Sequence, residues 1–273
     1  MNYRRFSLLR RFVIGCGLLI SWMVPGRIKA EPTAEAISSF NSYVSSVETR
    51  LDRQHRSGDG FLAVVASPDS EERLHRGELV IEQLTPATAS GLSEALLHHW
   101  RGTAFIPGAK STDFELLLKD FNSYPQHFSP QVLQASVLTR QGDQLQASMR
   151  VRQKHVITVV MDMTYDVTFG RLDAQRGYSI SRSIRASEID SPGTASERVL
   201  SSSQEHGFLW RLNTYWSYEE RDGGLYIQIE SISLSRSIPV GLGWVLRPYV
   251  ESVPRESLEF TLRSARSAIQ KKN

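Results

Sequence analysis

Histidines come first among the residues that could do chemistry, because an imidazole can bind a metal ion or act as a general base. The chain has seven of them: His55, His75, His98, His99, His127, His155 and His206. No two have the HExxH spacing of a helical zinc site, and on a strand His98 and His99 would point to opposite faces. The chain also has no GxSxG nucleophile turn, no P-loop and no complete GxGxxG. The sequence therefore predicts no metal site and no cofactor.

Three ionisable side chains interrupt segments that otherwise alternate between apolar and polar residues. His155 has the odd-numbered parity of the apolar residues around it, and Glu230 lies where the apolar phase of its segment changes. Arg182 shares the even parity of Tyr178 and Ile180. A charge in a low-dielectric interior needs a partner, so one hypothesis is a contact between Arg182 and Glu230, and the other is exposure to solvent. In a cavity these groups would orient a ligand carbonyl or hydroxyl, or transfer protons.

Large apolar and aromatic side chains on the predicted strands form a candidate cavity wall. Methionine and aromatic side chains pack adaptably against irregular apolar ligands. They would fill a packed core equally well, so a ligand cavity and a solid core are both open. The candidate wall residues are Trp100, Met149, Met161 and Met163, together with Trp210, Trp216 and Tyr218, which share the even-numbered face of one segment.

The strands that carry these residues follow from period-two alternation. Residues 145–169 alternate almost throughout, which predicts two long antiparallel strands that turn near Lys154 with their odd-numbered side chains inward. The segment 221–224 reads Arg-Asp-Gly-Gly and predicts a hairpin. Beyond it the apolar phase moves from odd to even, so either a bulge shifts the register or Gln228 and Glu230 point inward. The other predicted strands are Glu78–Leu84, His98–Pro107, Gly177–Ala186, Phe208–Glu220 and Leu225–Arg236.

Apolar residues at steps of three and four predict helices at both ends of the chain and one between. The helix over Ala34–Arg53 has a continuous apolar stripe, which either packs on its own domain or binds a partner or a membrane surface. A capped amphipathic helix follows Ser111. Pro254 opens the long C-terminal helix, after a shorter helix over Gly243–Val250.

Composition limits the class of protein. The 273 residues are 40% hydrophobic and 22% charged, which excludes a disordered chain, a collagen-like repeat and a polytopic membrane protein. Residues 1–30 hold six of the 32 basic residues and none of the 29 acidic ones, so the formal net charge of +3 becomes −3 for residues 31–273. The basic character belongs to the first 30 residues, and the sequence predicts no nucleic-acid partner.

Residues 1–30 resemble a secretory signal peptide in layout. An Arg-rich start precedes the uncharged stretch Val13–Val24, and Ala30 is a small residue at a cleavage position. Twelve residues span about 18 Å as a helix, short of a bilayer core of roughly 30 Å. We therefore expect export to the periplasm or outside the cell, with an uncleaved N-terminal anchor as the alternative. The only cysteine, Cys16, lies in this stretch, so the chain beyond it has no disulfide and no thiol nucleophile.

The order of elements predicts an α+β fold. One strand, two short helices, an antiparallel meander of about six strands and a long terminal helix follow one another. An antiparallel sheet with one apolar face needs a cover, and the last helix is the long element placed to supply it. We expect a curved sheet of about six to seven strands wrapped around that helix, with a cavity between them, plus an N-terminal helix.

In this order the chain resembles the START-like helix-grip superfamily, which includes lipid-transfer, polyketide-cyclase and coenzyme-Q-binding proteins. The matching parts are His98–Pro107 as first strand, Ser111–Pro130 as helix pair and Leu258–Ile269 as gripping helix. Residues 120–125, Asp-Phe-Asn-Ser-Tyr-Pro, are similar to the D-x-x-x-Y-P turn of the family. The resemblance covers roughly residues 97–270, so with the leader we expect three parts: a signal peptide (1–30), an N-terminal helix and extension (31–96), and a START-like domain (97–273).

The resemblance implies an apolar ligand but no particular catalytic residue, since only some members are enzymes. We expect a non-enzymatic protein that binds or carries a hydrophobic small molecule such as a lipid, isoprenoid or quinone. One alternative is a polyketide cyclase-like enzyme that uses His155, Arg182 or Glu230. Another is an interaction module with a packed core. The basic cluster Arg263, Arg266, Lys271 and Lys272 is either a solvated helix face or a transient contact with anionic lipid headgroups. The sequence predicts no oligomeric state.

Overall fold

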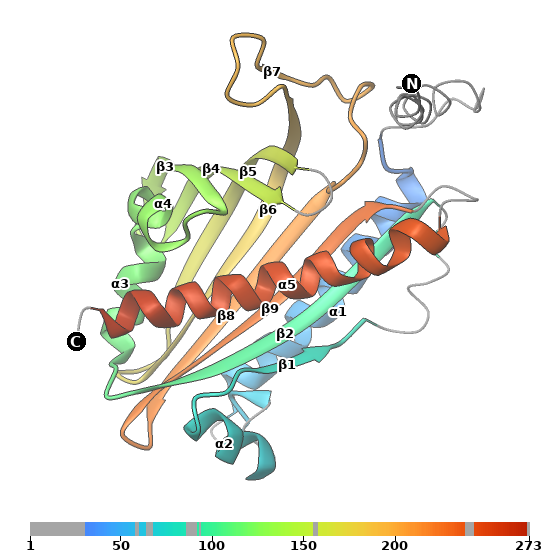
Figure 1. Cartoon of the computed structure of the whole chain (residues 1–273). Helices are drawn as coiled ribbons and strands as arrows, with labels where there is room; N and C mark the ends of the chain where they lie inside the picture. Colours follow the sequence, from blue (N-terminus) through green and yellow to red (C-terminus); the bar gives the residue numbers. More distant parts are fainter. Residues whose placement is uncertain are drawn as a thin grey trace, which may run out of the picture.

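The computed structural model describes residues 31–57, 60–63, 68–85, 92, 94–154, 158–237 and 243–271. These residues form a nine-stranded antiparallel sheet in the order β1-β2-β9-β8-β6-β5-β4-β3, with β7 paired to β6 (Figure 1). The strands are β1 (Val80–Gln83), β2 (Ala95–Pro107), β3 (Val132–Gln141), β4 (Gln144–Lys154), β5 (Thr158–Arg171), β6 (Arg176–Asp190), β7 (Arg198–Val199), β8 (Arg211–Arg221) and β9 (Gly224–Arg236).

Helix α5 (Gly243–Gln270) lies across one face of the sheet, which we call the inner face (Figure 1). Its buried residues Leu258, Leu262, Ala265 and Ile269 are the stripe expected from the sequence, and they pack into the largest apolar core. The end of α5 contacts α3 (Ser111–Lys119), which is followed by a 3-10 turn (Phe121–Ser123) and α4 (Tyr124–His127). The helix-grip arrangement predicted from the order of elements is therefore confirmed.

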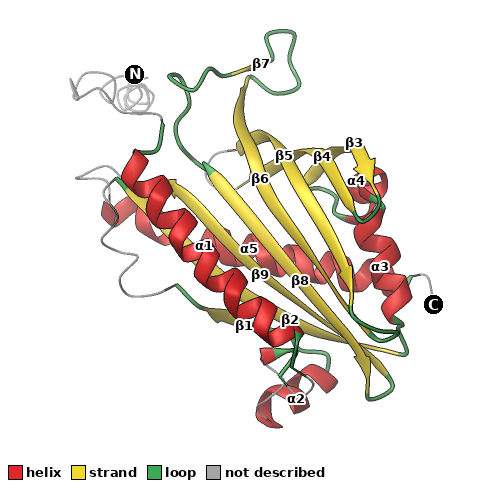
Figure 2. Ribbon diagram, turned by 180° about the vertical axis from the view of Figure 1, so that it is seen from behind, coloured by secondary structure: helices red, strands yellow, loops and turns green. Residues whose placement is uncertain are grey.

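Helix α1 (Ala34–His55) covers the opposite, outer face of the sheet (Figure 2). Its stripe of Ala36, Phe40, Val44, Val47 and Leu51 is buried in a second apolar core with Ile232, Leu234 and other residues of β2, β8 and β9. The short helix α2 (Pro68–His75) adds a third, small core around Phe105 and Tyr226. The central strands are therefore covered on both faces.

Double coverage explains the change of phase in the last strand. The pairings of β9 with β2 and β8 have no register shift, so there is no bulge. Leu225, Ile227 and Ile229 belong to the core under α5, whereas Ile232 and Leu234 belong to the core under α1. Gln228 and Glu230 are buried, as expected if no bulge is present. They are buried on the outer face of the sheet, which α1 covers. In β9, both odd-numbered and even-numbered apolar residues therefore lie on a covered face of the sheet.

The two long strands are as predicted. β4 ends at Lys154 and β5 begins at Thr158, and their odd-numbered side chains, from Leu145 to Phe169, supply the inner core. Residues 155–157, which include the candidate His155, lie outside the described residues.

Two expectations differ from the structure. The C-terminal helix begins at Gly243 and continues through Pro254, so the predicted break between two helices is wrong. The sheet also has more strands than the six to seven expected, because β3 and the two-residue β7 were not predicted. β3 is an edge strand whose residues are half-buried or exposed, so it lacks the strong apolar alternation of the central strands. No helix in the described ranges combines the length and apolarity needed to cross a membrane.

Candidate functional site

The inner core is tightly packed at the end of the sheet next to α3. Phe114 of α3 is fully buried and makes edge-to-face contacts with Trp216 and Tyr218 of β8. Leu262 and Ile269 of α5 are fully buried at the same core. This end of the inner face excludes water.

Away from α3 the same core is only partly covered. Several apolar side chains pack against it yet keep part of their surface in contact with solvent. They come from β2, β4, β5, β8 and α5, so they surround the inner face on several sides. The half-buried residues at this end are Trp100, Met149, Val151, Val159, Leu212 and Phe260. We call this set the half-buried wall.

Six of the predicted wall residues lie on the inner face. Trp100 and Met149 belong to the half-buried wall, and Met161, Met163, Trp216 and Tyr218 are buried in the core behind it. The indole Nε1 of Trp100 is buried and has no hydrogen-bond partner among the described residues. A buried N–H group without a partner is costly, so this donor needs a polar acceptor.

The other predicted residues that the structure describes lie on the outer face. Trp210 is buried in the core under α1, because it precedes β8 and so does not follow the alternation of that strand. The predicted contact between Arg182 and Glu230 is wrong. Arg182 instead donates to Glu48 of α1 at 2.7 Å, and Glu230 is paired with Arg50 of the same helix at 2.5 Å. Neither side chain can line a cavity between the sheet and α5.

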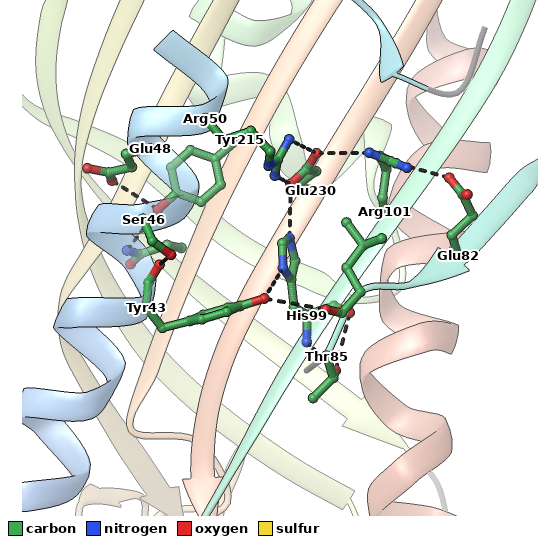
Figure 3. A network of polar contacts seen from close by, with 12 residues as sticks. Tyr43, Ser46, Glu48, Arg50, Glu82, Thr85, His99, Arg101, Tyr215 and Glu230 are labelled. Carbon is green, nitrogen blue, oxygen red and sulfur yellow. Dashed lines mark hydrogen bonds and ion pairs between the residues drawn. The ribbon is translucent and has the colours of Figure 1, made fainter. Parts of the chain in front are cut away.

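Glu230 is the centre of a buried polar network between α1 and the outer face (Figure 3). Its carboxylate accepts two hydrogen bonds from Arg50 and lies 2.9 Å from Nε2 of His99. Nδ1 of His99 is 2.8 Å from the hydroxyl of Tyr43, and Arg101 lies 3.7 Å from the carboxylate. The network joins α1, β2 and β9 through one carboxylate.

The network keeps Glu230 ionised. Burial raises the pKa of Glu230, but the hydrogen bonds from His99 and Arg50 outweigh burial and lower the pKa to about 2. Burial raises the pKa of Tyr43, so its phenol stays protonated at neutral pH. Tyr43, His99 and Glu230 therefore form a fixed series of hydrogen bonds. These bonds connect β2 and β9 to α1.

A second group of ligand-type side chains lies at α2. Glu71, His75 and Asp222 have donor atoms within 4.8 Å of one another, and the hydroxyl of Tyr226 is 2.7 Å from Nε2 of His75. The guanidinium of Arg221 lies 2.8 Å from Asp222 and 3.6 Å from Glu71. Because this cation already neutralises the carboxylates, the geometry is explained without a metal ion.

Two surface grooves are lined by charged side chains. One of about 510 Å³ lies on β3–β6, where Arg150 is paired with Asp162 at 2.7 Å and Glu197 at 2.6 Å. Another of about 340 Å³ lies between α2, β1 and α5, with Arg73, Glu78 and Arg263 in its lining. Neither groove is the apolar cavity predicted from the sequence.

The network residues Tyr43, Arg50 and His99 were not predicted as a unit. The sequence contained one signal, which is a carboxylate in the middle of the apolar segment Leu225–Leu234. The partner could not be found from spacing, because Arg50 lies 180 residues away on a helix whose position the sequence leaves open.

Comparisons with known proteins find likeness in structure only. No protein-family model matches the chain, and no curated protein sequence matches it. A START superfamily protein from Mycobacterium smegmatis is similar with a TM-score of 0.42 and 12% identity, covering 64% of this chain and 99% of that chain. The STAR-related lipid transfer protein from Xanthomonas axonopodis has a TM-score of 0.42 and 16% identity over 70% of this chain and 98% of its own. The Zhui aromatase/cyclase from Streptomyces has a TM-score of 0.44 and 12% identity over 64% and 95% of the two chains.

The architecture defines the fold by itself. The inner face of an antiparallel sheet grips a long C-terminal helix, and a short helix pair separates the first long strand from the meander. The first long strand, β2, pairs with the last, β9. The chain has a helix-grip fold, extended at its N-terminus by α1, α2 and β1.

Proposed function

We propose that the protein binds or carries a hydrophobic small molecule between the inner face of the sheet and α5. The observation that carries this proposal is the half-buried wall, where apolar side chains continuous with a closed core keep contact with solvent. Covering apolar surface is worth about 25 cal/mol per Å². A ligand of lipid, isoprenoid or quinone size would gain several kcal/mol by completing this core.

The positions of Arg182 and Glu230, two of the three residues considered for proton transfer, favour binding over catalysis. A cyclase-like enzyme would need proton-transfer groups beside the ligand. Glu230 and Arg182 are tied to α1 on the outer face, and a bound molecule under α5 could not reach them. These two residues therefore give no support to the enzymatic alternative.

The interaction-module alternative has less support for a different reason. It requires the apolar stripe of α1 to be available to a partner. Phe40, Val47 and Leu51 of that stripe are at most 5% exposed, since they pack on the protein's own sheet. A partner would have to displace the helix from its own core.

Export is part of the proposal and rests on the sequence of residues 1–30, with their arginine-rich start, apolar stretch and small residue at position 30. Transfer of the ligand at an anionic membrane surface would suit the basic residues of α5, of which Arg263 is 56% exposed. N-terminal sequencing of the protein recovered from the cell envelope tests the first part. An intact Met1 would contradict cleavage.

Extraction of the purified protein with organic solvent, followed by mass spectrometry, tests the carrier function. We expect an apolar molecule near one per chain. The variant Val151→Asp, which places a charge on the half-buried wall, should lose most of it. The matched control Ser148→Asp lies on the outer face of the same strand and should retain it.

Two results would contradict the proposal. One is a protein that carries no apolar molecule and takes up no apolar dye. The other is equal ligand retention by Val151→Asp and Ser148→Asp, provided that both variants unfold with the cooperativity of the original chain.

A further inference from the structure

The strand register places a row of polar groups across the inner face. Trp100 of β2 is opposite Ser231 of β9, Ser231 is opposite Thr214 of β8, and Thr214 is opposite Ser181 of β6. Residues opposite each other in an antiparallel pair share a face of the sheet. The four side chains therefore form a continuous line beneath α5.

The neighbouring positions confirm the face. Gly102, two residues from Trp100, faces α5, because a Cβ atom there would lie 2.5 Å from Leu258. Ile229 and Trp216, two residues from Ser231 and Thr214, belong to the inner core. One step further from α3, Ser233 is opposite His98 and Leu212. We call Ser181, Thr214, Ser231 and Ser233 the hydroxyl strip.

The residues of the hydroxyl strip are buried or half-buried. Ser181 and Ser233 are each 8% exposed, and Thr214 and Ser231 are half-buried. Among the described residues, none of the four hydroxyls is hydrogen-bonded to another protein group. The buried indole N–H of Trp100, at the end of the row, has no partner there either.

Polar groups in this position are unusual for a core. A buried N–H without a hydrogen bond costs about 1–3 kcal/mol, and the indole N–H of Trp100 is such a group. Apolar side chains would fill the same strand positions at no such cost, as Ile227 and Ile229 do in the neighbouring rows. The row is therefore better explained by a partner that supplies hydrogen bonds.

We infer that the ligand carries a neutral oxygen group, a hydroxyl or a carbonyl, that the hydroxyl strip and Trp100 bind, while its apolar part lies on the half-buried wall. This inference rests on the proposed function. Serine and threonine hydroxyls donate and accept hydrogen bonds, whereas the indole N–H only donates, so the group must include an acceptor. The strip contains no Lys or Arg, and a desolvated carboxylate or phosphate would need such a cation.

A matched pair of probes tests the inference on the full chain. 2-Naphthol and 2-methylnaphthalene have nearly the same shape and differ in the hydroxyl. Each is titrated against the neutral apolar dye N-phenyl-1-naphthylamine bound to the protein. We expect 2-naphthol to displace the dye with a dissociation constant roughly 3- to 10-fold lower, the value of one net hydrogen bond.

Variants locate the preference. Thr214→Val together with Ser231→Ala should bring the two dissociation constants within about twofold of each other, because the groups that distinguish the two probes are removed. Trp100→Phe, which keeps an aromatic ring, should reduce the preference. The control Ser136→Ala lies on an exposed position of β3 and should change neither constant.

The outcomes separate the two proposals. Equal binding of both probes by the original chain overturns the inference and leaves the proposed function standing. A preference for 2-naphthol that survives in both the double variant and Trp100→Phe also overturns it. If neither probe nor the dye binds, the proposed function fails, and the inference fails with it.

Discussion

At the scale of single residues, Glu230 is the side chain on which the outer layer depends. Its carboxylate is 2% exposed and is bound by Arg50 and His99 from two different elements. Breaking a buried ion pair from one side is more destabilising than losing an exposed one, because the remaining charge stays buried. The Glu230 network is thus an attachment point for α1.

We expect Glu230→Gln to lower the free energy of unfolding by about 3–5 kcal/mol, the range for one-sided loss of a buried pair. Asp52→Asn is the matched control, because Asp52 pairs with Arg56 on the exposed side of α1 and such pairs contribute less than about 1 kcal/mol. Urea denaturation of the three proteins measures both values. Equal losses would show that the network does not stabilise α1.

Stability should also depend on pH in two windows. Burial lowers the pKa of His55 to about 4 from 6.5. The contribution of neutral His55 to the free energy of unfolding is therefore complete above pH 6.5 and is lost as the pH falls toward 4. Glu230, with its pKa lowered to about 2 from 4.5, contributes stability above pH 4.5 that is lost as the pH falls toward 2. Unfolding free energies from pH 8 to pH 2 measure both.

His55→Phe assigns the upper window, since phenylalanine keeps the ring that stacks on Tyr178 but cannot be protonated. The variant should lose the pH dependence between 6.5 and 4. An unchanged slope would mean that another group titrates there.

The sequence predicted residues of the inner core well and their partners poorly. Alternation put Met161, Met163 and Tyr218 on a buried face, since strand geometry fixes which residues share a side. Alternation does not say what covers each side. Arg182 was predicted to line the cavity for that reason, whereas it lies in the outer layer.

At the scale of elements, the contact between α5 and β2 depends on a missing side chain. Gly102 lies beneath Leu258 and Leu262, whose nearest atoms would be 2.5 Å and 3.2 Å from a Cβ atom. A larger residue would force the side chain of Leu258 to move and disturb the packing of α5 on β2. The spacing of apolar residues in 258–269 predicted the buried stripe of α5. Only the structure shows that this stripe packs against Gly102.

We expect Gly102→Val to destabilise the fold by about 1–3 kcal/mol, as overpacking does. Adding Leu258→Ala should recover part of that loss, because it removes the side chain that clashes. A double-mutant cycle measured by thermal unfolding gives the coupling. Additive losses would place the strain somewhere other than under α5.

At the scale of the whole molecule, the two helices cover the same central strands from opposite sides. β9 pairs with β2 and β8 and is buried on both faces, whereas β3 is an edge strand whose residues are half-buried or exposed. Local opening follows exposure and the number of neighbours. Amide hydrogen exchange should therefore be slowest in β9 and fastest among the long strands in β3.

Mass spectrometry of peptides from these strands after deuterium labelling checks this order. Ligand binding should slow exchange in β4 and β5, which carry Met149, Val151 and Val159 of the half-buried wall. No added protection of β4 and β5 on ligand binding would contradict the described site.

The coverage by α1 has a mechanical consequence. Strands β2, β9 and β8 are held between two helices, so the part of the sheet that supports α5 is stiff. Strands β3 to β5 have no helix behind them in the described part of the chain, and they form the compliant side (Figure 2). Ligands of different size would be accommodated by bending of strands β3 to β5, while strands β2, β9 and β8 under α5 keep their shape.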